Sequence, residues 1–133
     1  MKRSFALPLL FVLACKPPTP AEQMDAVVSW VSTAGMAGDA WLRHTTPDNY
    51  TRQALQLSNQ QLLEIGTELR KSPPPAIDGA TLDSVLTRSR FHIAQMARLV
   101  EEKNAPDFKT QLDSLRTDQR LVKQLSDSVE STQ

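Results

Sequence analysis

The sequence predicts an all-α protein, an antiparallel up-down-up-down four-helix bundle over residues 21–133. Composition is the first observation: only 4 of 133 residues are glycine and 5% are aromatic, which favours helices over a sandwich or barrel. Four apolar stripes with helical spacing are the second. The third is that short turns with capping residues and prolines separate these stripes, and similar helices joined this way bury their stripes most simply as a bundle. Two helical hairpins that open, or that pair between chains, are the alternative.

The first expected helix follows a capping box and runs to about Arg43. Thr19 can accept a hydrogen bond from a backbone N–H, Pro20 suits the first helical position, and Glu22 can reach back to the cap. One broad face carries apolar and small residues, and the small ones allow another helix to approach closely: Met24, Val27, Val28, Val31, Ala34, Gly35, Gly38 and Leu42.

The second expected helix has Thr46 as its cap and Pro47 as its first residue, and it runs to about Lys71. Its apolar stripe consists of Leu55, Leu62, Ile65 and Leu69. The three prolines that follow Ser72 stop this helix and force an extended loop to Asp78.

Asp78 is expected to cap the third helix, which spans about 79–103. Its inward residues are Leu82, Val85, Leu86, Ile93, Met96, Leu99 and Val100. A sharp turn over 104–107 leads to the fourth helix, whose stripe is Phe108, Leu112, Leu115, Val122, Leu125 and Val129.

Residues 1–14 have the features of a secretion signal: a basic start (Lys2, Arg3), an apolar run and a small residue before Cys15. The run 12–15 (Val-Leu-Ala-Cys) resembles the lipobox of bacterial lipoproteins. The resemblance implies cleavage after Ala14, diacylglycerol on the Cys15 sulfur and usually a third acyl chain, such as palmitate, on the new amino group. A plain signal peptide or an uncleaved anchor is the alternative. Cys15 is the only cysteine, so no disulfide can form within the chain.

The resemblance implies a protein of the cell envelope that is anchored to a membrane through its acyl chains. The proline-rich residues 15–20 are then a semi-rigid, lipid-anchored spacer. In an organism with two membranes, Lys16 after the cysteine resembles the pattern of lipoproteins exported to the outer membrane, where the protein would face the periplasm. Cleavage after Ala14 would leave 13 basic and 15 acidic side chains, a balance that does not suggest nucleic acid as a partner.

Antiparallel helices bring a group of polar residues to one level near the middle of the predicted bundle. They lie on or beside the apolar stripes: Ser58, Asn59, Ser89, His92, Asp118 and Gln119. Because unpaired buried polar groups destabilise a fold, these side chains are expected to bond to one another or to trapped water. One interpretation is a network that fixes helix register. The other is a site for a metal ion, haem or another small ligand around His92.

The chemistry of known sites favours the register network. A structural zinc site needs about four ligands, and only His92 and Asp118 converge. Neither histidine has the Glu-x-x-His spacing of di-iron bundles, and the Cys-x-x-Cys-His attachment motif of haem is absent. We therefore expect no cofactor beyond the covalent lipid. No serine lies in a nucleophile setting, so the sequence does not predict an enzyme.

Aromatic residues on helix surfaces favour partner binding. Phe91 is expected on the outer face of its helix, and Trp30 and Trp41 on one shoulder of the first helix. The tryptophans form either a groove or the edge of the core. The sequence thus predicts a membrane-anchored envelope lipoprotein that binds or scaffolds a partner, with another envelope protein as a candidate. It leaves the identity of the partner and the oligomeric state open. A ligand-carrying bundle is the second functional hypothesis.

Overall fold

The computed structural model describes residues 16–132, which form four helices. These are α2 (Pro20–Leu42), α3 (Asp48–Lys71), α4 (Gly79–Glu101) and α5 (Ala105–Ser131). The expected signal peptide and Cys15 lie outside the described residues. None of the four described helices combines the length and the apolar character needed to cross a membrane.

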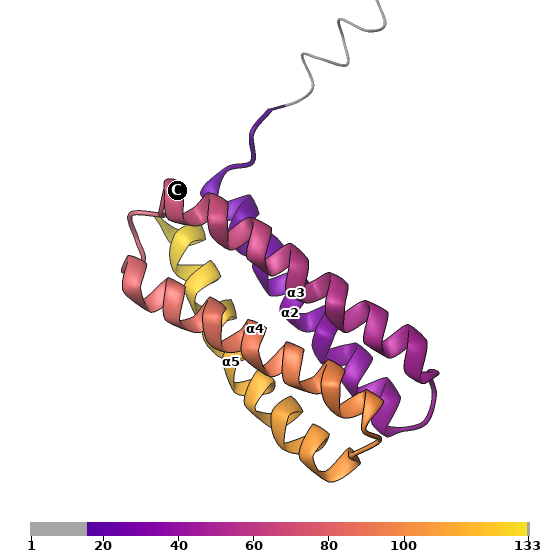
Figure 1. Cartoon of the computed structure of the whole chain (residues 1–133). Coiled ribbons are helices and arrows are strands. Elements are labelled where there is room, and N and C mark those ends of the chain that lie inside the picture. Colours follow the sequence, from indigo (N-terminus) through magenta and orange to yellow (C-terminus); the bar gives the residue numbers. More distant parts are fainter. Residues whose placement is uncertain (1–15, 133) are drawn as a thin grey trace, which may run out of the picture.

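The helices form the predicted antiparallel up-down-up-down bundle (Figure 1). Each helix packs against two neighbours, and α5 closes the bundle by packing on α2, while α2 and α4 touch only slightly across the diagonal. The start of α2, the loop 72–78 and the end of α5 share one end of the bundle, which we call the proximal end (Figure 1). The turns 43–47 and 102–104 form the opposite, distal end.

Side-chain caps begin three of the helices. At the start of α2 the capping box is complete: Glu22 N donates to Thr19 Oγ1 at 3.1 Å, and Thr19 N donates to Glu22 Oε1 at 2.9 Å. Asp78 caps α4 as expected, and Asn104 caps α5.

The expected cap at Thr46 is wrong. Helix α3 begins at Asp48, and the residue before it, Pro47, provides no side-chain cap. The Thr46 hydroxyl instead bonds to the Thr51 hydroxyl at 2.9 Å, one turn inside the helix. Because Thr51 is fully buried, this pairing supplies a partner for a polar group in the core.

The distal turns both use a non-glycine residue in the left-handed conformation, His44 with φ 60° and Lys103 with φ 54°. In each turn the next backbone N–H bonds to the carbonyl five residues earlier, at 2.9 and 3.0 Å, which is the Schellman pattern for ending a helix. Lys103 Nζ also reaches across to Asp48 Oδ2 at 2.8 Å. This hydrogen bond lowers the pKa of Asp48, and the hydrogen bond from the Trp41 indole lowers it further by a smaller amount.

The core is built from the predicted stripes. Its largest fully buried side chains are Phe108, Met24, Leu55, Leu62, Leu69, Ile93, Met96, Leu115, Val27, Val31, Val100 and Val122. Four residues expected to face inward are only half-buried at its edge: Val28, Leu42, Ile65 and Leu125.

Gly38 marks the tightest contact of α2 with the core. A methyl group there would lie 2.8 Å from Met96 Cε, 3.2 Å from Leu112 Cδ1 and 3.3 Å from Phe108 Cε1. The expectation that small residues in the first helix permit close packing therefore holds at this position.

Candidate functional site

The structure brings together part of the expected mid-bundle polar layer, at the interface of α4 and α5. His92 Nε2 lies 3.6 Å from Asp118 Oδ2, and the Asp118 side chain is only 3% exposed. Ser89, three residues before His92 on α4, is also fully buried. The prediction that His92 and Asp118 lie close together is thus confirmed.

Two residues outside the predicted layer complete this group. Arg88 Nε donates to Asp118 Oδ1 at 3.0 Å, and Gln111 Oε1 lies 2.8 Å from His92 Nδ1. Arg88 was not predicted as a member of the layer, although it lies four residues before His92 and a buried carboxylate needs a partner. Below, these five residues (Arg88, Ser89, His92, Gln111 and Asp118) are called the α4/α5 polar cluster.

The cluster contains two buried polar atoms without a hydrogen-bond partner among the described residues, Ser89 Oγ and Asp118 Oδ2. Elsewhere in the expected layer, Ser58 Oγ donates to the Ala54 carbonyl at 2.8 Å, so its polar group is satisfied within α3. Buried polar groups without partners are rare in folded proteins. Asp118 Oδ2 lies 3.6 Å from His92 Nε2, so its nearest polar neighbour is the imidazole of the same cluster.

Asn59 and Gln119 do not join the cluster, and the expectation that Asn59 meets His92 and Asp118 is wrong. Asn59 Oδ1 accepts from Arg90 Nε at 2.9 Å, at the interface of α3 and α4. Gln119 Nε2 donates to Ser32 Oγ at 3.0 Å, at the interface of α2 and α5. Each helix of a bundle has two neighbours, so side chains at the same height can face different interfaces.

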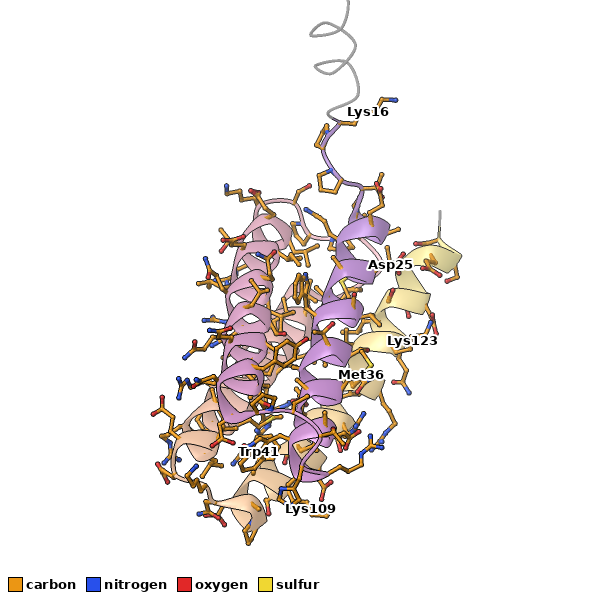
Figure 2. All side chains as sticks on the ribbon, turned by 90° about the vertical axis from the view of Figure 1, so that its right-hand side faces the viewer. Lys16, Asp25, Met36, Trp41, Lys109 and Lys123 are labelled. Atoms are coloured by element: carbon orange, nitrogen blue, oxygen red, sulfur yellow. The ribbon has the colours of Figure 1, made fainter. Side chains whose placement is uncertain are left out.

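The three aromatic residues expected at a partner surface do not share one face. Trp41 is a core-edge residue: it is 9% exposed, its ring centroid lies 4.6 Å from that of Phe108, and its Nε1 donates to Asp48 Oδ1 at 2.8 Å. Figure 2 shows Trp41 towards the distal end of the bundle. Trp30 is half-buried and packs against the core. Both tryptophans lie on α2, diagonally across the bundle from Phe91 on α4.

Phe91 is exposed as predicted, at 55% of its surface. Its ring meets the ring of His92 edge-on, with centroids 5.6 Å apart and planes at 72°. The imidazole is in turn held by Gln111 and faces Asp118. One edge of Phe91 therefore contacts an imidazole that belongs to the polar cluster, while most of its ring is exposed.

A shallow groove runs between α4 and α5 from Arg88 towards the proximal end. Its floor and walls include Ala80, Val85, Leu121 and Leu125. Leu121, at 36% exposure, is a large apolar side chain that lines this groove. Phe91 follows Arg88 by three residues on α4 and is not among the residues that line the groove.

Comparison of the chain with protein-family models, with curated proteins and with solved structures finds no match. Within residues 16–132, no group of three or more histidine, cysteine or acidic side chains is arranged to hold a metal ion. The site must therefore be interpreted from its own chemistry.

Proposed function

We propose that this protein is a membrane-anchored envelope lipoprotein whose bundle binds a partner protein through Phe91 and the adjoining groove of α4 and α5. The observation that carries the proposal is the exposure of Phe91 beside the imidazole of His92. A large aromatic side chain in water is a poor contributor to a fold but a common anchor at interfaces. The groove with Leu121 offers a neighbouring apolar surface.

The anchor part of the proposal rests on the lipobox at residues 12–15 and on the segment after it. Residues 16–19 are exposed and extend away from the proximal end (Figure 2). Pro20 is the fifth residue after Cys15, so an extended spacer would hold the bundle about 15 Å from its lipids. Phe91 lies twelve residues into α4, about 18 Å further along the bundle. A partner at this height would contact the bundle outside the lipid layer.

Metabolic labelling with a fatty acid tests the anchor. Cys15→Ser removes the sulfur that would carry diacylglycerol, so the variant should lose its label and its membrane attachment through acyl chains. Equal labelling of the variant and the natural protein would refute the lipoprotein assignment.

Cross-linking in intact cells tests the partner surface, with Phe91→Ala as the variant and Tyr50→Ala as the matched control. Tyr50 is a similarly exposed aromatic residue, at 60%, but it lies on α3. Phe91→Ala should weaken cross-linking to the partner protein about thirtyfold or more, because interface anchors contribute about 2 kcal/mol or more. It should leave the melting temperature nearly unchanged. Equal cross-linking of both variants would rule out Phe91 as the anchor.

A further inference from the structure

The side of the bundle formed by α2 and α3 differs from the other sides in its lack of charge. Residues 26–38 of α2 and residues 53–63 of α3 contain no acidic or basic side chain. Trp41 Nε1 donates to Asp48 Oδ1 at 2.8 Å, so the distal ends of these antiparallel helices lie level and the two uncharged segments lie side by side. Each of the other three helix interfaces carries an ion pair, whereas none joins α2 to α3 among residues 16–132.

Apolar side chains cover the surface between these two segments. Trp30 is half-buried, and because it lies eleven residues before Trp41 it points within about 20° of that side chain, towards α3. Leu57 is 48% exposed and points about 160° away from Asn59, which bonds to α4, so it lies on the outer surface near α2. We call this surface the α2/α3 face, and it consists of Ala26, Trp30, Thr33, Ala37, Ala54 and Leu57.

The α2/α3 face can be covered at little cost in hydrogen bonds. The hydroxyl of Thr33 already donates to the Ser29 carbonyl at 2.8 Å, inside its own helix. Gln53 and Gln60 are exposed on α3 beside the face, and they supply a polar but uncharged rim. An apolar surface with a polar rim is typical of an interaction site.

We propose that two copies of this chain pair side by side through their α2/α3 faces, with their bundles parallel in one membrane. An uncharged surface meets a copy of itself without bringing like charges together. A two-fold axis parallel to the helices places α2 of one copy against α3 of the other. Thr33 lies about 12 Å along α2 from Trp41, and Leu57 lies about 14 Å along α3 from Asp48. Thr33 of one copy and Leu57 of its partner therefore face each other at one level.

The parallel orientation rests on the proposed lipid anchor. Residues 16–19 lead into the start of α2 at the proximal end, so anchored copies stand with that end towards the membrane (Figure 2). The uncharged segments are about 20 Å long, and neighbouring helix axes lie about 8–10 Å apart. The face then buries about 400 Å² per copy, or about 800 Å² in total, which is less than the roughly 1,200 Å² of a stable interface. Confinement to one membrane raises the effective concentration and compensates for the small area.

Pairing of this kind leaves the proposed partner surface free. Phe91 lies on α4, which is diagonally opposite α2 in the bundle. The same chain can therefore pair with a second copy and hold a partner protein at Phe91. Each pair would then present two Phe91 side chains, one on each outer side.

Disulfide trapping of full-length chains in intact cells tests the pairing. One copy carries Thr33→Cys and a differently tagged copy carries Leu57→Cys, so a disulfide between the two tags joins two chains. Leu63→Cys replaces Leu57→Cys in the matched control, because Leu63 is also on α3 and is 40% exposed but points within about 40° of Asn59, towards α4. We expect the Leu57 pair to give about tenfold more mixed disulfide, since a disulfide requires Cα atoms within about 7 Å.

A charge placed in the α2/α3 face gives a second test. Ala37→Arg, introduced into both tagged chains, should lower the yield of mixed disulfide about tenfold or more, because the guanidinium must be buried in an apolar contact. Met36→Arg is the control: Met36 is 62% exposed and points about 100° away from Ala37. It should leave the yield unchanged, and both variants should melt near the temperature of the natural protein.

Fatty-acid labelling in the same cells separates this proposal from the lipid anchor. An unlabelled chain refutes the anchor, whereas the ratio of the Leu57 and Leu63 yields reports on the face itself. Equal yields from the two pairs would overturn the pairing, with or without label. An excess of disulfide between two Leu57→Cys chains over the mixed product would overturn the parallel arrangement, because it would place α3 against α3.

Discussion

Removing Arg88 should destabilise the bundle far more than removing the carboxylate that it binds. Arg88 is the only described residue that donates a hydrogen bond to Asp118, and the two side chains are 44% and 3% exposed. Arg88→Met keeps the packing of the aliphatic stem but leaves a buried carboxylate without a donor. Breaking a buried pair in this way costs about 3–5 kcal/mol. Because water can enter where the guanidinium was, we expect about 2–3 kcal/mol here.

The opposite change, Asp118→Leu, removes the buried charge itself. Arg88 is then free to turn into solvent, as its exposure allows, and we expect a cost of about 1 kcal/mol or less. The double variant should be about as stable as Asp118→Leu alone, which corresponds to a coupling of about 2 kcal/mol. Denaturant unfolding of the four proteins measures all three quantities. Costs that add to within about half a kcal/mol would show that the two side chains do not interact, and would refute this account of the cluster.

Two further predictions concern packing and pH. Gly66→Ala should stabilise α3 by about 0.5–1 kcal/mol, because the added methyl group meets only ordinary contacts, the nearest at 3.4 Å. Gly38→Ala should instead destabilise the protein, because Met96 and its neighbours must move to make room for the methyl group. Overpacking of this kind costs about 1–3 kcal/mol. Equal urea midpoints for the two variants would contradict this. Lys103 lowers the folded-state pKa of Asp48, so the stabilising contribution of Asp48 is present above its unfolded-state pKa and is lost as the pH falls through the folded-state value. Asp48→Asn should therefore reduce the loss of stability on acidification, and an unchanged acid transition would argue against this ion pair.

Much of the fold could be predicted because it is encoded locally. The capping box at Thr19, the cap at Asp78 and the prolines after Ser72 act on the few residues beside them, so they set helix boundaries without help from the rest of the chain. Apolar spacing likewise fixes which face of a helix turns inward, because burial of that face drives the packing. Thr46 failed as a cap because Thr51, a partner in the next turn, competes for its hydroxyl.

The candidate site depended on tertiary structure. The position of a residue along the bundle axis follows from the lengths of the helices and turns. For this reason His92 and Asp118 could be expected near each other. Which interface a polar side chain faces depends on helix rotation, and one residue changes that direction by about 100°. Asn59 therefore turns to Arg90 while its neighbour Ser58 stays within the core. The sequence by itself determined four helices, the caps at Thr19 and Asp78 and most of the inward faces, because these depend on neighbouring residues. Only the tertiary structure decided that a carboxylate, an imidazole and a guanidinium meet between α4 and α5, because that contact requires two helices to be placed and rotated relative to each other.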